Sequence, residues 1–289
     1  MISYLALFKK MKVNPLFWFV IGMGVLTGYF REVLMVFVIV FVHEMGHAVA
    51  AHFFRWRIRK IELLPFGGVA EVEEGGNRSF KEEVIIITAG PLQHVWMMAA
   101  SYGLVALEMW NVSTYQQFLW YNVTILAFNL LPILPLDGGR LMQLLCMRFW
   151  PYRLALRRTV GLSFLFLTVA VCVAAILYPF HLNLWLVLTF LIVNNYLEYK
   201  QCHYRFIRFL TERFYIGLRQ QGKPHLPVVV SAHQEVSEVA KQFRRGVIHT
   251  IIVNDAKQKR THYLPETEVL RALFEAKLPR APLSTIIAK

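Results

Sequence analysis

The sequence predicts an α-helical multi-pass membrane protein with about six transmembrane helices, a membrane-associated β-hairpin and a small α/β domain at the C-terminus. Of the 289 residues, 56% are hydrophobic and only 17% are charged, which is too apolar for an ordinary soluble domain. From Lys200 onward the chain carries 16 of its 31 Lys and Arg but 7 of its 18 Asp and Glu. We therefore expect this last part to be basic and water-soluble, and to meet an anionic lipid surface or a protein rather than nucleic acid.

Six apolar runs have about the length that a helix needs to cross the hydrocarbon core, which is ~20 residues. They occupy approximately residues 14–30, 33–54, 83–107, 117–136, 159–179 and 182–199. Basic residues precede the first run, as in a signal peptide, but Arg31 and Glu32 follow it where a cleavage site of small residues would be, so we interpret it as an uncleaved span. Lys and Arg gather before the first run, after the second and fourth, and after the sixth. The positive-inside rule then predicts that both termini are cytoplasmic.

The segment between the second and third runs predicts a β-hairpin. In IRKIELLPFGGVAEVEE, residues 58–74, apolar residues alternate with Lys and Glu on both sides of Pro-Phe-Gly-Gly. Such a hairpin can lie on the surface, or it can dip into the membrane and offer an open edge strand to an extended peptide. The pattern leaves both alternatives open.

The C-terminal part predicts a small α/β domain. After residue 220 the chain reads LPVVVS, EVSEVAKQFRRG, HTIIVND and TEVLRALFEA, a pattern of strand, helix, strand and helix. A unit of about 65 residues is small for an independent fold, so we expect it to pair with a second copy or to pack on a neighbour. The expected division is a six-span membrane domain over 1–200, a linker over 201–222 and the α/β domain over 223–289.

Two histidines and a glutamate lie inside the second apolar run, in FVHEMGHAVA. His43 and His47 are four residues apart, so on a helix both imidazoles can bind one zinc ion, with Glu44 beside them to take a proton from water. Counted from Val33, His43 is ~15 Å into the run, about half of the hydrocarbon thickness. A carboxylate at that depth costs at least ~2.5 kcal/mol, which favours a functional role. The alternative is three polar residues that bond neighbouring helices without a metal.

Asp137 is the expected third ligand, because a catalytic zinc site usually has three protein ligands and one open position. It is the only aspartate among the first 254 residues and lies in NLLPILPLDGGR. Pro132 and Pro135 cannot continue a regular helix, and such broken backbone is tolerated in a membrane where it lines a cavity. The alternative is that Asp137 caps the helix that follows. His94, in AGPLQHVW, is expected to be an ordinary core histidine.

Two other classes of protein fit part of the pattern. A proton- or metal-coupled transporter would use His43, Glu44 and Asp137 to carry ions, and it would have two similar halves, which residues 1–110 and 111–200 do not show. A nucleotide-sensing membrane scaffold would depend on the C-terminal domain instead. One zinc ion per chain, lost when His43 is replaced by Ala, would argue against the scaffold.

HEMGH in one apolar run and NLLPILPLDGGR in a later one, with LLPFGG and AGP between them, resemble the site-2 protease family of intramembrane zinc metalloproteases. The resemblance implies that one zinc ion is bound by His43, His47 and Asp137, and that Glu44 is the general base for peptide hydrolysis. It also implies roles in substrate positioning for residues of the fourth run and of the hairpin, namely Asn129, Pro135, Pro65, Phe66 and Gly67.

The layout of spans and C-terminal domain is most similar to the branch of this family that acts in sporulation. That similarity implies a membrane-associated sigma-factor precursor, pro-sigma-K, as the substrate, and inhibitory sporulation membrane proteins as partners. It further implies a location in the outer forespore membrane, facing the mother cell.

The C-terminal unit resembles a single CBS domain, a module that can bind adenine nucleotides and that pairs in dimers or larger oligomers. The resemblance implies a homo-oligomer that forms through this domain. Nucleotide-binding members usually have a Ser or Thr that is followed three residues later by Asp. The corresponding stretch here, LPETEV, has Pro265 and Glu268 at these two positions. ATP binding is therefore left open.

Overall fold

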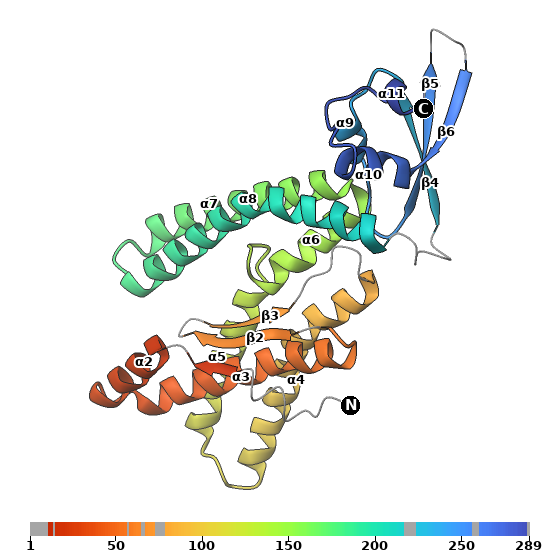
Figure 1. Ribbon diagram of the computed structural model, residues 1–289. Helices are drawn as coiled ribbons and strands as arrows, with labels where there is room; N and C mark the ends of the chain where they lie inside the picture. The colour runs from red at the N-terminus through yellow and green to blue at the C-terminus, as the bar shows by residue number, and fades with distance from the viewer. Residues whose placement is uncertain are drawn as a thin grey trace. The chain divides into compact units, whose positions relative to one another are not determined.

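Helices make up most of this protein, as the sequence predicts (Figure 1). The structure is a computed structural model, and it describes residues 11–13, 15–56, 58–64, 67–72, 79–216, 224–255 and 260–287. The helices in these ranges are α2 (Pro15–Leu26), α3 (Phe30–Phe53), α4 (Phe80–Ala106), α5 (Val112–Asn129), α6 (Asp137–Phe149), α7 (Tyr152–Leu177), α8 (Leu182–Ile216), α9 (Val236–Ala240), α10 (Glu266–Phe274) and α11 (Ser284–Ile287). The strands form two three-stranded sheets and are β1 (Met11–Val13), β2 (Ile58–Leu64), β3 (Gly67–Val72), β4 (His225–Ser231), β5 (Ile248–Asp255) and β6 (Arg260–Pro265).

Among the described residues, three helices are long and apolar enough to cross a membrane, namely α3, α4 and α7. They correspond to the expected spans at 33–54, 83–107 and 159–179. Helix α2 has only 12 residues, and α5 ends at Asn129, because the prolines of the following segment cannot continue a helix. The count of six spans therefore stays a prediction.

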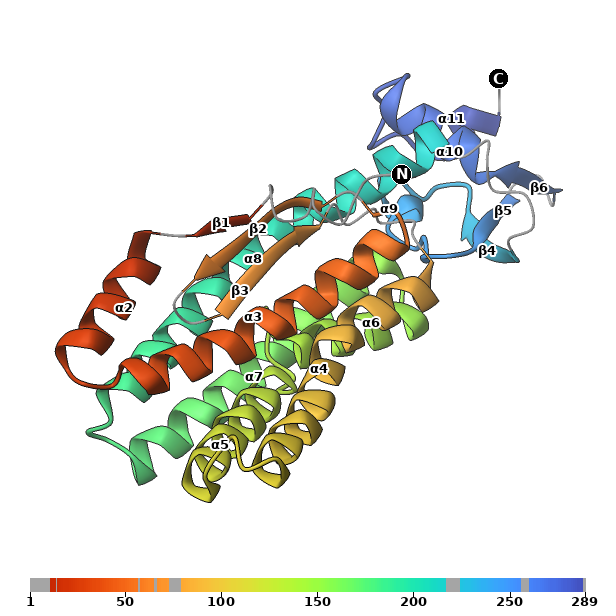
Figure 2. The same cartoon turned by 90° about the horizontal axis from the view of Figure 1, so that it is seen from below.

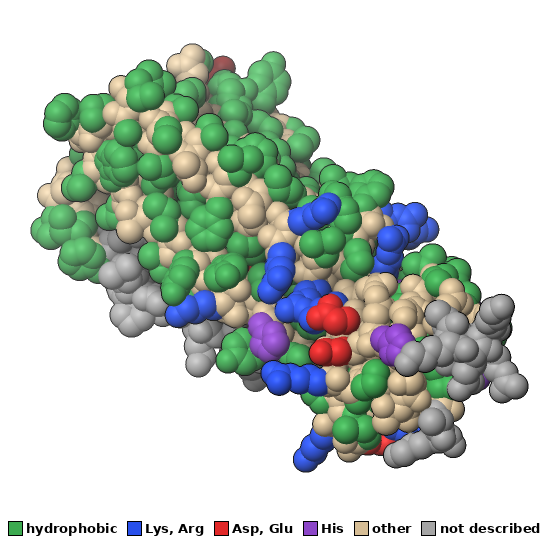
Figure 3. Space-filling model, turned by 90° about the horizontal axis from the view of Figure 1, so that it is seen from above, with side chains coloured by type: hydrophobic (Ala, Val, Ile, Leu, Met, Phe, Trp, Pro, Cys, Tyr) green, Lys and Arg blue, Asp and Glu red, His purple; other side chains and the backbone are tan. Residues whose placement is uncertain are grey.

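Large apolar side chains are exposed on the candidate spans. On α7, Leu165, Val169 and Ile176 are more than half exposed, and on α4 the same holds for Leu92 and Val95. Figure 3 shows a face with a wide region of hydrophobic side chains that few charged side chains interrupt. Surface of this kind suits contact with lipid tails, which are as apolar as the side chains themselves.

The first of two compact units comprises residues 1–74, 81–141 and 169–191. In this unit α3 packs against α5, and the β1–β2–β3 sheet lies along α3 (Figure 2). Ile39, Met97 and Phe118, from α3, α4 and α5, form a buried apolar cluster. The buried face of α3, which includes His43 and His47, is therefore covered by protein.

The predicted hairpin is confirmed. Strands β2 and β3 are antiparallel, and Leu64 lies opposite Gly67 next to the turn. The expected turn residues Pro65 and Phe66 lie outside the described residues, and Gly67 begins β3. Since β1 pairs in parallel with the other side of β2, β3 is an edge strand of the sheet as far as the structure describes it.

The second compact unit comprises residues 75–80, 142–168 and 192–289. Its sheet has the order β4–β5–β6, in which β4 is parallel and β6 antiparallel to β5. The expected strand, helix, strand and helix are present as β4, α9, β5 and α10. The sequence did not predict β6, because RTHYLP contains no run of apolar residues. The unit closes around a core of apolar side chains that includes Val236, Val239, Phe243, Ile251, Val253, Val269, Leu270 and Leu283.

Helix α8 continues through most of the stretch expected to be a linker. The expectation over 201–222 is wrong for residues up to Ile216, and the rest of that stretch lies outside the described residues. Phe206, Phe209 and Leu210 are buried in the core of the second unit. Their spacing of three to four residues is that of one helix face, so the polar residues between them lie on the other side of an amphipathic helix.

A buried ion pair fixes the end of α8 within the second unit. Arg213, which is 2% exposed, donates from Nε and Nη2 to the carboxylate of Glu266, each at 3.0 Å, and from Nη1 to the carbonyl of Arg244. The backbone N–H of His249 and its ring Nδ1 donate to Glu266 Oε2 at 2.8 and 3.2 Å. Burial raises the pKa of Glu266, but hydrogen bonds from His249 and Arg213 outweigh it and hold the pKa below its ordinary value. The carboxylate is therefore ionised and satisfied.

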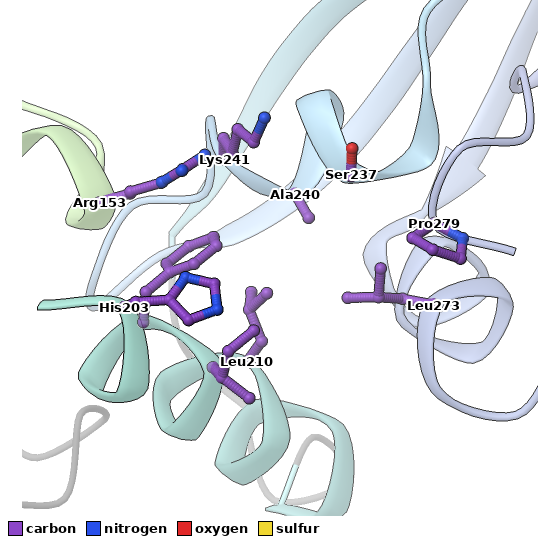
Figure 4. A pocket seen from close by; sticks show the side chains of 10 residues that line it. Arg153, His203, Leu210, Ser237, Ala240, Lys241, Leu273 and Pro279 are labelled. Atoms are coloured by element: carbon purple, nitrogen blue, oxygen red, sulfur yellow. The ribbon is translucent and has the colours of Figure 1, made fainter. Parts of the chain in front are cut away.

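The pocket drawn in Figure 4 also lies in the second unit, among α7, α8, α9 and α10. Phe206, Leu210 and Leu273 contribute apolar surface to it, and Arg153 and Lys241 contribute cations. Its ten lining residues include no carboxylate. The pocket therefore offers no set of donors for a metal ion.

Candidate metal centre

Helix α3 carries the two histidines of HEMGH on one face, as their spacing predicts. His43 and His47 are 3% and 9% exposed, and their Nε2 atoms are 3.1 Å apart. A separation of four residues is about one helical turn, which brings the two rings next to each other on the helix in an edge-to-face arrangement, with an interplanar angle of 83°. The pair thus presents two nitrogens to a single point.

Asp137 reaches these nitrogens from the start of α6. Helix α5 ends at Asn129, and α6 begins at Asp137 after a short irregular segment. A Cβ atom at Gly138 would overlap the carbonyls of Leu130 and Leu131, and one at Gly139 would lie 2.5 Å from the carbonyl carbon of Ile133. The two glycines therefore let the segment fold back onto the first turn of α6, which buries Asp137.

The carboxylate of Asp137 completes a triangle of donor atoms. Its Oδ2 lies 3.1 Å from His43 Nε2 and 3.3 Å from His47 Nε2. Nitrogen and oxygen ligands lie ~2.0 to 2.2 Å from a tetrahedral zinc ion, so two of them are roughly 3.3 to 3.6 Å apart. Among the described residues, His43, His47 and Asp137 form the group of donors that could hold a metal ion. The three sides of the triangle, 3.1, 3.1 and 3.3 Å, lie at the short end of this range or about 0.2 Å below it. The three donors are therefore close enough to share one zinc ion, and the fourth position of a tetrahedral site is left for a water.

The protonation of His47 also fits a metal site. His47 Nδ1 lies 2.8 Å from the carbonyl oxygen of Ile86, which can only accept, so Nδ1 carries the proton. A neutral imidazole has one N–H, and His47 Nε2 therefore presents a lone pair toward Asp137 Oδ2. That oxygen is buried and has no hydrogen-bond partner. Two acceptors that face each other at this distance need a cation between them, which is either a metal ion or a proton added to the ring.

The same contacts bear on the alternative that Asp137 is a helix cap. Asp137 does lie in the first turn of α6, where a carboxylate is favourable. Its Oδ2, however, faces the two histidines and makes no hydrogen bond to the helix. The geometry favours the role of ligand.

Two glycines let α4 approach the centre closely. A Cβ atom at Gly46 would lie 2.6 Å from the carbonyl oxygen of Ala89 and from Cγ of Gln93. A Cβ atom at Gly90 would overlap the ring of His47 at Nε2. The space beside the donor atoms therefore exists only because residue 90 has no side chain.

We expect Gly90→Ala to lower the zinc content of the purified protein, because the added methyl group occupies the space at His47 Nε2. Metal analysis of the purified variant measures the effect. Gly103→Ala on the same helix is the control, since no atom of the described residues lies within 4 Å of its added Cβ. Equal zinc content in both variants would contradict this location of the centre.

His94 and Asn122 contact the centre, and the sequence did not predict this. His43 Nδ1 lies 3.0 Å from His94 Nε2, and His94 Nδ1 lies 2.5 Å from Asn122 Oδ1. His94 is buried, as expected of a core histidine, but it touches a candidate ligand. Its place in AGPLQHVW, four residues after the glycine that faces His47, is a signal that could have indicated this contact.

Glu44 follows His43 directly on α3 and is half-buried. The ionisable groups that influence it electrostatically are His43, His47, Asp137 and Arg140. A carboxylate beside the donor triangle can accept a proton there. Its position is consistent with the general base expected from the sequence.

Asn129 and Pro135, which the sequence analysis expects to position a substrate, come shortly before Asp137 in the chain. No contact in the structure assigns them that role. Asn129 is the last residue of α5 and donates from Nδ2 to the carbonyl of Ile125 at 3.1 Å. Pro135 is half-buried and follows Leu134 through a cis peptide bond. Of the hairpin residues expected to position a substrate, Pro65, Phe66 and Gly67, only Gly67 is among the described residues.

Comparison with known proteins agrees with this centre. Residues 32–113 and 106–175 match peptidase family M50. Stage IV sporulation protein FB of Bacillus subtilis (strain 168) is 40% identical over 285 residues, which are 99% of this chain and 98% of that protein. A zinc metalloprotease of Methanocaldococcus jannaschii is 30% identical over 144 residues, or 48% of this chain and 38% of that protein. The solved structure of a site-2 protease from the same organism has a TM-score of 0.51 at 25% identity, and covers 65% of this chain and 89% of that one.

Proposed function

This chain belongs to peptidase family M50 and is an intramembrane zinc metalloprotease of the site-2 type, and we propose that it cleaves a sigma-factor precursor, pro-sigma-K, during sporulation. The observation that carries the proposal is the triangle of His43, His47 and Asp137 in a chain that is similar over almost its full length to a sporulation protein. Removal of the N-terminal pro-sequence would release the sigma factor from the membrane.

We assign the chemistry to four residues. His43, His47 and Asp137 would hold the zinc ion, which would supply a polarised water and a Lewis acid for the scissile carbonyl. Glu44 takes the proton from the attacking water and passes it to the leaving amine. Since the donor atoms are buried, water must reach them through a polar path from the cytoplasm.

Substrate positioning is assigned to the hairpin and to the segment before α6. A helix hides its carbonyl groups, so the substrate must be extended at the scissile bond. The edge strand β3 can pair with an extended segment through its main chain, as in other cases of strand addition. Pro65, Phe66 and Gly67 would hold that segment, with Asn129 and Pro135 closer to the metal.

The wider organisation is proposed from the sequence patterns and the similarity to the sporulation protein. We propose six spans within 1–200, both termini in the cytoplasm, and a place in the outer forespore membrane with inhibitory membrane proteins as partners. The unit over 223–289 is proposed as a CBS-like domain that pairs in an oligomer. If it binds ATP, Arg153 and Lys241, which line the pocket in Figure 4, would contact the phosphates, and Lys241 would exchange its ion pair with Glu238 for that contact.

Co-expression with pro-sigma-K tests the substrate. The precursor should be shortened in membranes that contain the wild-type chain, and removal of zinc with a chelator should stop the processing. A membrane-anchored protein with an unrelated cytoplasmic tail is the control for general proteolysis. An uncut precursor beside zinc-loaded enzyme would contradict the substrate, and ion flux in liposomes without proteolysis would favour a transporter instead.

A further inference from the structure

Three buried side chains from three helices form a chain of contacts that ends at the metal centre. It runs from His43 on α3 to His94 on α4 at 3.0 Å, and from His94 to Asn122 on α5 at 2.5 Å. Their exposed fractions are 3%, 0% and 0%. Each contact joins two protein groups, whereas the amide nitrogen Nδ2 of Asn122 is buried with no hydrogen-bond partner among the described residues.

The direction of each hydrogen bond follows from the far end of the chain. Asn122 presents its carbonyl oxygen Oδ1, which can only accept, so His94 Nδ1 must carry a proton. A neutral His94 then has a lone pair at Nε2, and this atom accepts a proton from His43 Nδ1. His43 Nε2 is consequently left without a proton, and it is the atom that faces Asp137 Oδ2.

Both ligand histidines therefore carry the proton on Nδ1, but a different hydrogen-bond acceptor fixes this tautomer in each of them. His47 donates to the backbone carbonyl of Ile86, whose acceptor character cannot change. His43 donates to His94, a side chain that can hold its proton on either nitrogen. If His94 carried its proton on Nε2, it would donate to His43 Nδ1, and the proton of His43 would move to the atom that binds the metal.

We propose that His94 and Asn122 are positioning residues for the metal centre, in which Asn122 fixes the tautomer of His94 and thereby keeps His43 Nε2 free to bind zinc. The proposal rests on the proposed function, because it takes His43 as a zinc ligand. Partners that accept a hydrogen bond from a ligand imidazole also fix the plane of its ring and raise its basicity. Loss of such a partner lowers metal affinity by about 10- to 100-fold.

Zinc affinity of the purified full-length protein, measured by competition with a chelator, tests the proposal. Asn122→Leu has a similar shape but no acceptor, and we expect it to weaken zinc binding by about 10- to 100-fold. Asn122→Asp retains an acceptor that cannot donate when ionised, so it should bind zinc as tightly as the wild type or more tightly. Ser101→Ala is the matched control, since Ser101 is buried on α4 and bonds only within its own helix, to the carbonyl of Met98.

The outcomes separate this proposal from the proposed function. If the wild type binds no zinc, the metal centre itself is wrong. If the wild type binds zinc but Asn122→Leu binds it equally well, or if Ser101→Ala weakens binding as much as Asn122→Leu, the positioning role is wrong. Equal losses in Asn122→Leu and Asn122→Asp would also overturn it, because the acceptor would then not be the property that matters.

A direct measurement avoids variants that fail to fold. Nitrogen NMR of the zinc-free wild-type protein, with labelled histidine, distinguishes the two neutral tautomers. We expect His43, His47 and His94 all to carry the proton on Nδ1. A proton on Nε2 of His43 or His94 would overturn the proposal.

Discussion

Glu44→Gln is expected to abolish peptide cleavage while one zinc ion stays bound to each chain. Glutamine has nearly the same shape, but its amide cannot take a proton from water, and general base catalysis of this kind contributes roughly 10²- to 10⁴-fold. The three donor atoms belong to other residues, so their triangle is unchanged. Processing of the co-expressed precursor and the zinc content of the purified protein measure the two effects separately.

Glu212→Gln is a suitable control for the loss of a carboxylate. Glu212 lies on α8, and it pairs with Arg208 in the second unit. This variant should process the substrate at the wild-type rate. Normal processing by Glu44→Gln itself would show that another group activates the water, and the assignment of the general base would then be withdrawn.

Asp137→Asn is expected to reduce both zinc content and cleavage, and it separates the two roles considered for Asp137. Asparagine is as good a helix cap as aspartate, so the substitution should be neutral if Asp137 only caps α6. As a zinc ligand, however, an amide lacks the charge of the carboxylate. We expect zinc to be lost at chelator concentrations that leave the wild type loaded, with cleavage falling in parallel.

The thermal stability of Asp137→Asn provides the control. The zinc-free variant should remain folded at the temperature of the chelator experiment, so that its loss of zinc is not a consequence of unfolding. Full zinc content in the variant would contradict the ligand role and favour the cap.

The ligand residues could be predicted from the sequence because each depends on a short local pattern. Two histidines four residues apart lie on one face of any α-helix, and the surrounding apolar run predicts that helix. Asp137 is the only aspartate of the apolar part, and the prolines before it mark the break in the backbone that the structure places between α5 and α6. The hairpin was predictable for the same reason, from alternation on both sides of one turn.

The partners of the centre could not be predicted in this way. His94 is 51 residues from His43, and Asn122 is 28 residues from His94, so no periodic pattern connects them. The prediction of a linker over 201–222 was wrong up to Ile216 for a different reason. The polar residues after Lys200 indicate exposure, but they do not distinguish a loop from an amphipathic helix. The helix is favoured because Phe206, Phe209 and Leu210 pack into a core that earlier residues, such as Tyr152, and later residues of the chain both supply.

The buried pair of Arg213 and Glu266 has a consequence for the biogenesis of the protein. Helix α8 leaves the ribosome before the sheet that contains His249, so the guanidinium group is in place when the carboxylate arrives. A tail that folded without α8 would bury Glu266 without its guanidinium partner and with only the hydrogen bonds from His249, at a cost of about 3–5 kcal/mol, which is a large part of the stability of a small domain. Chains in which α8 does not reach its place would therefore keep an unfolded tail, which cellular proteases can recognise and remove.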